Sequence, residues 1–475
     1  MMNRREFLVA AGGLAACCGA ARAAADTSKR PPNFLVILAD DLGARELGCY
    51  GHPAHQTPNI DALGAAGVRF ETAYTATICH PTRVMMLTGQ YGCHNGVLNF
   101  AGRRGGPDPK SPVEDIGKNH TTFAEVLKER GYATALAGKW QLSGEVPTLI
   151  HDCGFDEYCI WAYAHDLPAG VKHTGGFEND KGKTARYWHP CIMKNGQYVE
   201  TTPDQFGPDI HRNFLIDFMR RNRERPFLAY YPMCLVHGPL YRTPDTKDLP
   251  DLSHDTKTGL LKDNVEYMDK EVGLLTAALE ELGLRENTVV IFTGDNGPAG
   301  NGKGDATELG ARVPMIINAP GMVKQRGATR ELTDMSDIFP TLAAFAGAAL
   351  PKDKVIDGHS LASFLGGETE KTRDWIFSFI GDRRILRSKR WLLEDNSPGQ
   401  FGRLYDCGGS VDGTGYKEVT ASQDPEVAAV KAEFAKILEG LPAPVLPDEG
   451  GPKDRKPGRG MRRGSEKGGG DAREE

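Results

Sequence analysis

The sequence predicts an α/β protein in which a mostly parallel sheet lies between two layers of helices, followed by a smaller C-terminal α+β subdomain. Three observations support this fold class. The chain has 475 residues, 40% of them hydrophobic, so it can bury a large core and exceeds the usual length of one compact domain. Apolar runs alternate with helical patterns along most of its length. Polar residues repeatedly follow these runs, as they do at the carboxyl ends of parallel strands.

The N-terminus predicts an export signal over residues 1–25. Arg4 and Arg5 precede a run rich in Ala, Gly and Leu that is too short to span a bilayer. Twin arginines in this position are typical of the twin-arginine (Tat) export machinery, so we expect a periplasmic or secreted protein. Two processing routes remain open. We favour cleavage at the Ala-x-Ala patterns of 21–25 over a lipobox-like sequence that would anchor a lipoprotein through Cys17.

Four apolar runs predict buried strands, and polar residues follow each of them. The strands are Asn33–Ala39 before Asp40 and Asp41, Tyr132–Ala137 before Gly138 and Lys139, Pro226–Cys234 before His237, and Thr288–Thr293 before Asp295 and Asn296. Because the carboxyl ends of parallel strands meet at one edge of a sheet, we expect these polar side chains to lie close together.

The pattern changes after Ile356, where the apolar runs become shorter. Antiparallel strands and one helix are predicted at 375–380, 384–386, 391–393 and 424–441. We therefore place a catalytic α/β domain at 31–370 and a C-terminal subdomain at 371–441. Residues 442–475 consist largely of Gly, Pro and charged residues with almost nothing apolar, which predicts a disordered tail.

Charge and cysteine content exclude several classes of function. A net charge of -6 over this length predicts no nucleic-acid or membrane surface, so any anion site must be a local cluster of basic residues. No paired C-x-x-C zinc pattern is present, and we expect most cysteines to be small buried hydrophobic residues. An oxidising compartment permits disulfides, but the sequence does not reveal their pairing.

The acidic residues that follow the predicted strands 33–39 and 288–293 predict a metal site. Adjacent carboxylates repel each other unless a cation lies between them. Asp40, Asp41, Asp295 and Asn296 offer hard oxygen ligands without a His/Cys set, which favours Ca²⁺ or Mg²⁺ over zinc. Each pair alone is also an ordinary helix cap or turn signal, so the prediction depends on the two pairs occurring together.

Three basic residues, in or near the same motifs, predict a binding site for an anion. Arg83 lies one helical turn after Cys79, Lys139 follows a strand, and Lys303 lies in the Gly-rich stretch NGKGDATELGARVP. Guanidinium and the positive N-terminus of a helix that begins at Cys79 both suit a tetrahedral oxyanion. His237 is a candidate proton donor for a leaving oxygen. Taken singly, each lysine is more often a solvated surface residue, and such a histidine is often structural.

The stretch from Cys79 to Arg83 reads C-H-P-T-R and matches the pattern C-x-P-x-R. With TPNIDALGAAGVRF at 57–70, GKW at 138–140, GDNG at 294–297 and KGDATELGARVP at 303–314, the chain resembles the type I, formylglycine-dependent sulfatases of the alkaline phosphatase superfamily. The resemblance covers roughly residues 31–440. It implies an alkaline phosphatase-like fold with a large mixed sheet, and hydrolysis of an organic sulfate ester. For an exported enzyme we expect a sulfated carbohydrate.

The resemblance also implies a role for each site residue. A maturation enzyme converts Cys79 to Cα-formylglycine, whose hydrate attacks sulfur. The modified Cys79 joins four further ligands of a cation, which we predict to be Ca²⁺ with Mg²⁺ as the alternative: Asp40, Asp41, Asp295 and Asn296. By the same resemblance, Arg83 would hold the hydrated aldehyde. Lys139 and Lys303 would bind the sulfate, and His237 or Lys303 would serve the leaving oxygen.

Two positions depart from the family pattern. Gln141 in GKWQLS replaces the histidine of GKWHLG, and a glutamine can hydrogen-bond the diol but cannot take its proton. Ala164 replaces a serine that some arylsulfatases have, with His165 beside it. Two alternative functions therefore stay open. One is a phosphoester or phosphonate ester hydrolase of the same superfamily, and the other is a catalytically silent, cation-dependent glycan-binding protein.

Substrate specificity is expected to come from two loops, at 92–118 and 165–187. Trp161, Tyr163 and Trp188 lie in or near the second loop and are candidates for stacking on a sugar or aryl ring. Aromatic residues in such loops are more often local packing anchors.

Overall fold

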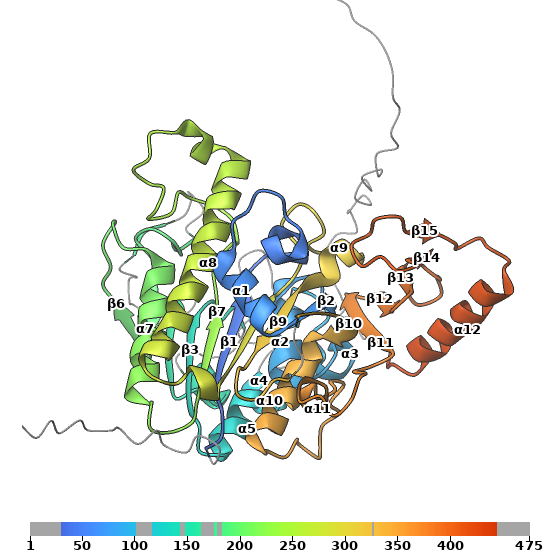
Figure 1. The fold of residues 1–475 in the computed structure, drawn as a ribbon, viewed down its shortest axis with the longest axis horizontal. Helices are drawn as coiled ribbons and strands as arrows, with labels where there is room; N and C mark the ends of the chain where they lie inside the picture. The colour runs from blue at the N-terminus through green and yellow to red at the C-terminus, as the bar shows by residue number, and fades with distance from the viewer. Residues whose placement is uncertain are drawn as a thin grey trace, which may run out of the picture.

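The computed structural model describes residues 30–100, 116–142, 148–162, 175–177, 183–324 and 327–443. A ten-stranded sheet lies at its centre, in the order β10-β2-β9-β8-β1-β7-β3-β4-β5-β6 (Figure 1). The strands are β1 Asn33–Ala39, β2 Val68–Tyr74, β3 Ala133–Gly138, β4 Glu157–Trp161, β5 Ile192–Lys194, β6 Gln197–Val199, β7 Phe227–Pro232, β8 Thr288–Gly294, β9 Arg312–Asn318 and β10 Gly327–Asp334.

The sheet is mixed but mostly parallel, as predicted. Strands β8, β1, β7, β3 and β4 run parallel to one another, and β10 runs parallel to β2. The antiparallel members are β9, which pairs with β8 and β2, and β5, which pairs with β4 and β6. The predicted strand at 33–39 matches β1, and the other three predicted strands overlap β3, β7 and β8.

Helices cover both faces of the sheet. The longer ones are α1 Pro58–Ala66, α2 Cys79–Thr88, α5 Phe123–Glu129, α7 Gly207–Arg221, α8 Lys257–Glu281 and α10 Ile338–Ala346. Shorter α-helical and 3-10 segments are α3 Gly92–Asn95, α4 Ile116–Asn119, α6 Thr148–Asp152, α9 Glu308–Ala311, α11 Ala362–Leu365, η2 Ala44–Glu46, η3 Gly48–Tyr50, η5 Leu252–Asp255, η6 Arg285–Asn287 and η7 Met335–Asp337.

Strand β1 shows how the two layers are built, because its side chains alternate between them. Phe34, Val36 and Leu38 belong to the core with α2, α5 and α10, whereas the residues between them belong to the core with α1, α7 and α8. A strand that is buried on both faces reads as a continuous apolar run, which is how NFLVILA appears in the sequence.

A second sheet of five antiparallel strands follows in the C-terminal part of the chain and extends to one side in Figure 1. Its strands are β11 Trp375–Ile380, β12 Arg383–Ser388, β13 Trp391–Asn396, β14 Arg403–Asp406 and β15 Lys417–Glu418, and the helix α12 Pro425–Glu439 follows them. The predicted smaller α+β unit is therefore present. Its first three strands and its helix coincide with predicted elements, whereas β14 and β15 were not predicted.

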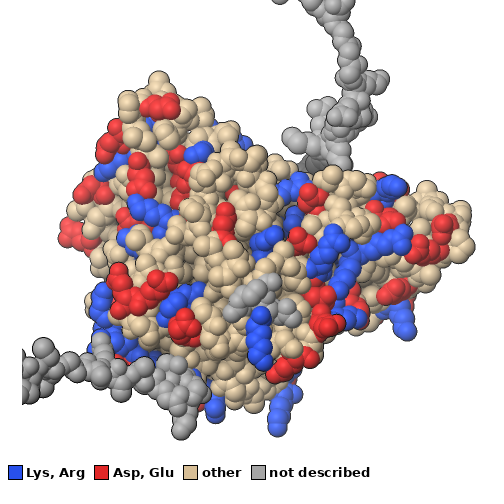
Figure 2. Space-filling view, in the orientation of Figure 1, with Lys and Arg blue, Asp and Glu red and all other residues tan. Residues whose placement is uncertain are grey.

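Several sequence-based predictions concern residues outside the described ranges. These are the export signal with Cys17 and the tail beyond 443. Among the described residues, no helix combines the length and apolar character that crossing a bilayer requires. The eight cysteines of this part of the chain are free thiols, and six of them are buried as expected. Acidic and basic side chains are interspersed over the face shown in Figure 2, so an anion site has to arise from local clustering.

Candidate active site

Four adjacent strands, β8-β1-β7-β3, carry the predicted polar residues to one edge of the sheet. Asp40 follows β1, Lys139 follows β3, His237 follows β7 and Asp295 follows β8. These strands are parallel, so their carboxyl ends coincide and their loops converge there. The convergence predicted from the sequence is confirmed in the structure.

Helix α2 presents Cys79 to this edge at its first residue. Thr82 fixes the segment that leads into the helix, because its hydroxyl donates to the carbonyl oxygens of Ala76 and Ile78 at 2.9 Å each. The helix ends at Gly89, which has a φ of 68° as an αL cap. Every residue of α2 is buried, and the partial positive charge of its N-terminus lies at the Cys79 thiol.

Three cationic side chains pair with three carboxylates around Cys79. Lys139 Nζ donates to Asp40 Oδ2 at 2.6 Å, and Arg83 Nη2 donates to Asp295 Oδ2 at 2.6 Å. A second Arg83 nitrogen, Nη1, donates to the main-chain oxygen of Lys139 at 3.0 Å. In the third pair, Lys303 Nζ donates to Asp41 Oδ1. Cys79, Asp40 and Asp295 each place a potential ligand atom within 4.8 Å of the others.

The predicted ligand residues also leave acceptor atoms without partners. Asp40 Oδ1, Asp41 Oδ2 and Asn296 Oδ1 are buried and have no hydrogen-bond donor. Asn296 donates through Nδ2 to Asp41 Oδ1 at 2.8 Å, which leaves its own carbonyl oxygen as an acceptor. Buried oxygens are normally satisfied, so this cluster of orphaned acceptors fits a hard divalent cation such as Ca²⁺ or Mg²⁺.

The pKa values of the carboxyl groups support the same conclusion. Burial raises the pKa of Asp295 to about 7, and the neighbouring Asp40 charge adds to the rise against the effect of Arg83. Burial acts on Asp40 in the same sense, but the charges of Lys139 and Arg83 outweigh it and hold the Asp40 pKa well below its usual range. Asp295 therefore needs more positive charge nearby to stay fully ionised beside the charged Asp40.

Comparison with known proteins decides the family. Residues 32–348 match the family model described as Sulfatase. The chain belongs to the sulfatase family. Human arylsulfatase A is 35% identical over 74% of this chain and 71% of that relative. Mouse steryl-sulfatase is 31% identical over 76% and 69%, and N-acetylgalactosamine-6-sulfatase from dog is 32% identical over 74% and 69%. The chain is therefore a sulfatase enzyme, as the C-x-P-x-R motif indicated.

Solved structures show the same fold. The PsFucS1 sulfatase from Pseudoalteromonas sp. superposes with a TM-score of 0.68 at 21% identity, covering 87% of this chain and 92% of that one. BT4656 in complex with its substrate D-glucosamine-2-N,6-O-disulfate superposes with a TM-score of 0.63 at 19% identity, covering 87% and 97%. At these identities the likeness concerns the fold alone.

His237 of the sulfatase faces the cluster through one ring nitrogen. Its Nε2 lies 3.7 Å from Asp41 Oδ2, and its Nδ1 lies 2.8 Å from Arg186 Nη1. Burial lowers the His237 pKa to about 3 despite the opposing charge of Asp40. Arg186 was not predicted from the sequence, because it lies outside every motif and only the fold brings it to His237.

Arg186 also explains the position of Trp161. The Arg186 guanidinium lies over the Trp161 ring, 4.2 Å from its centroid, and the Trp161 side chain is 3% exposed. The proposed stacking of Trp161 on a substrate ring is therefore wrong, and the packing alternative is the one observed. Tyr163 lies outside the described residues, as do Ala164 and His165.

Gln141 of the sulfatase lies in strained backbone beside Lys139. Its φ is 61°, its side chain is 6% exposed, and its Oε1 has no hydrogen-bond donor. His80 is also buried with an unpartnered Nδ1, and burial lowers its pKa to about 3. The structure thus brings Cys79 and the predicted acidic and basic residues to one edge of the sheet, with Gln141 two residues after Lys139.

Proposed function

We propose that this sulfatase releases inorganic sulfate from sulfated carbohydrates, using Cys79 in the form of Cα-formylglycine and a divalent cation, which we expect to be Ca²⁺. The observation that carries the proposal is the clustering of Cys79 with carboxylates whose buried oxygens lack partners. A carboxylate cluster of this kind has no role for an unmodified, buried thiol. It suits an oxygen nucleophile, which the hydrated formylglycine would supply beside a Lewis-acidic cation.

The chain's own residues would position the sulfate group. Lys139 and Lys303 extend from two sides of the cluster and each brings a positive charge to it. Arg83 is 1% exposed and held by two hydrogen bonds, so its guanidinium is oriented before substrate arrives. Fixed positive charge of this kind stabilises negative charge that develops on sulfate oxygens.

The leaving oxygen needs a proton or a hydrogen bond, and two residues are placed to give it. His237 faces Asp41 through Nε2, and Lys303 contacts the same carboxylate. Both therefore border the space next to Asp41, where the bond to the leaving group would break. We assign the role to this pair.

The carbohydrate class rests on the relatives. One curated relative is an N-acetylgalactosamine-6-sulfatase, and a structure with the same fold holds D-glucosamine-2-N,6-O-disulfate. A Tat-exported enzyme would also meet sulfated glycans outside the cytoplasm. Another relative is a steryl-sulfatase, so sterol and aryl sulfates belong in any screen.

The experiment is a paired screen of sulfate and phosphate release, using protein produced together with a formylglycine-generating maturation enzyme. Sulfated mono- and oligosaccharides, steryl sulfate and aryl sulfates form one panel, and the matching phosphate esters form the other. We expect sulfate release from sulfated sugars, and none from the Cys79→Ala variant. Release of phosphate alone would favour the phosphoesterase alternative. Glycan binding without any release would favour a silent binding protein.

A further inference from the structure

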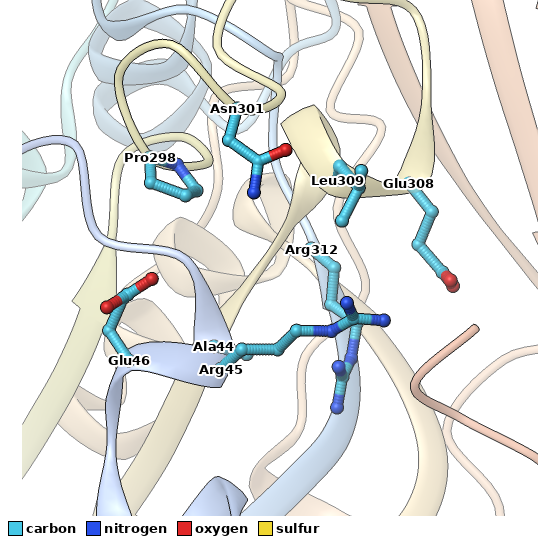
Figure 3. Close-up of a pocket in the computed structure, with 8 residues that line it drawn as sticks. All are labelled: Ala44, Arg45, Glu46, Pro298, Asn301, Glu308, Leu309 and Arg312. Carbon is cyan, nitrogen blue, oxygen red and sulfur yellow. The ribbon is translucent and has the colours of Figure 1, made fainter. Parts of the chain in front are cut away.

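A small hollow between the segment that follows Asp41 and the loop that carries Lys303 is lined by two arginines (Figure 3). Arg45 comes from η2 and Arg312 from the start of β9, and Asn301 reaches over the hollow from the facing loop. All three side chains carry N–H donors. None of them has a role in the reaction as proposed above.

The two walls of the hollow are continuous with the site. One wall, η2, begins three residues after Asp41, and the other is the loop from Pro298 to Leu309, which carries Lys303. The contact between Lys303 Nζ and Asp41 Oδ1 joins the same two segments. A substrate whose sulfate lies at Lys303 would therefore have the hollow next to it.

The two arginines of the hollow form no direct ion pair with a carboxylate of the described residues, and Asp412 acts on Arg45 only through longer-range electrostatics. Within the described part of the chain, neither Arg45 nor Arg312 has a carboxylate oxygen within 4.0 Å. Arg312 is 7% exposed and is held in place by the bond from its Nε to the main-chain oxygen of Glu71 at 2.9 Å. Arg45 is exposed, so it can adjust to a ligand.

Two acidic residues also border the hollow, and among the described residues neither carboxylate lies within ion-pair distance of the two arginines. Glu308 Oε1 accepts hydrogen bonds from Tyr74 at 2.7 Å and Tyr416 at 3.2 Å. Glu46 lies on the other side of the hollow, with Oε2 3.6 Å from His55 Nδ1. The two guanidinium groups thus face one space, and an anion bound there would neutralise their charge.

We propose that the hollow is a subsite for a second anionic group of the substrate, either a carboxylate or a further sulfate on the sugar next to the one that is cleaved. This inference rests on the proposed function, because it takes the first anionic group to be the sulfate at Lys303. It narrows the substrate class to glycans with acidic groups on neighbouring sugars. Guanidinium binds both kinds of oxyanion through paired N–H donors, so one subsite serves both.

The test compares three substrates that share one sulfated N-acetylhexosamine. They are the monosaccharide, the disaccharide with a neighbouring uronate, and the disaccharide with a neighbouring sulfated neutral sugar. In Arg45→Met, we expect KM for either or both disaccharides to rise about tenfold relative to KM for the monosaccharide. A change of this size corresponds to the loss of one charged hydrogen bond. The disaccharide that is affected identifies the anion. Arg220→Met, at a side chain 58% exposed on α7, is the control and should leave all three KM values unchanged.

A binding measurement gives an answer even if no substrate is turned over. Isothermal titration of the same sugars into Cys79→Ala protein should show tighter binding of a disaccharide than of the monosaccharide, and Arg45→Met should abolish that preference. Equal KM ratios in wild type and Arg45→Met, or no binding preference in Cys79→Ala protein, would overturn the subsite. Absence of sulfate release from every substrate, with the binding preference intact, would instead contradict the proposed function.

Discussion

Replacing Lys139 by methionine should destabilise the metal-free sulfatase strongly, and excess calcium should restore much of the loss. The Lys139 side chain is 1% exposed, and its Nζ lies 2.6 Å from Asp40 Oδ2. Methionine keeps most of the apolar stem but removes the closer of the two cations beside the buried Asp40, since Arg83 Nη2 lies 3.6 Å from Oδ1. Breaking a buried pair in this way costs about 3–5 kcal/mol of unfolding free energy.

Calcium should offset that cost because the proposed cation site uses the same carboxylate. A cation that binds only the folded state adds about 2.7 kcal/mol of stability at a concentration 100 times its Kd. In wild type a cation would compete with Lys139 for Asp40, whereas in Lys139→Met the closest competitor would be absent. The stabilisation by calcium should therefore be larger in the variant than in wild type.

The assay is urea unfolding followed by circular dichroism, in chelator and in excess calcium. Lys128→Met is the matched control, because Lys128 Nζ pairs with Asp156 at 2.8 Å but its side chain is 48% exposed. An exposed pair contributes about 0–1 kcal/mol, and calcium should not change that value. If Lys139→Met costs the same in chelator and in calcium, or no more than Lys128→Met does, the carboxylate of Asp40 is not shared with a cation.

The remaining predictions concern the metal, the unusual glutamine and a buried histidine. Asp295→Ala should abolish sulfate release and calcium-dependent stabilisation but keep the circular dichroism spectrum, since Asp295 lies at a strand end; retained turnover in a demetallated sample would contradict this. Stopped-flow measurements should show a burst of the leaving alcohol, because Gln141 cannot act as a base, and Gln141→Ala should slow the phase after the burst. No burst, with full turnover in Gln141→Ala, would exclude this residue from the chemical step. His211 is fully buried with no partner for either ring nitrogen, and burial lowers its pKa to about 3, so its contribution to stability is present above pH 6.5 and lost as the pH falls. Between pH 6.5 and 5 wild type should lose about 2 kcal/mol of unfolding free energy that His211→Leu does not lose, and equal losses would refute the assignment.

The strands that could be predicted from the sequence are those whose residues are all buried to a similar extent. Strand β1 is buried on both faces, so its apolar run gave correct bounds. Strand β10, GATRELTD, lies at the edge of the sheet with an exposed first half, and its polar residues gave no strand signal. The antiparallel placement of β9 also depends on long-range pairing, which local patterns do not encode.

The site was predictable to the extent that it lies in motifs at strand ends. Asp40, Lys139 and Asp295 follow apolar runs directly, so their convergence followed from the geometry of parallel strands. Arg186 and Arg312 come to the site or its border only through the fold. Their sequence contexts do not distinguish them from arginines in surface ion pairs, and only burial in the folded chain does.

Mass spectrometry of the peptide that contains residue 79 tests the chemistry of the site most directly. The sulfatase should be isolated from its own host, and its rate of sulfate release measured on the same preparation. The peptide should be lighter by the difference between a thiol and an aldehyde, and the modified fraction should follow the turnover rate from one preparation to the next. Full turnover in a preparation whose Cys79 is entirely unmodified would contradict the formylglycine chemistry.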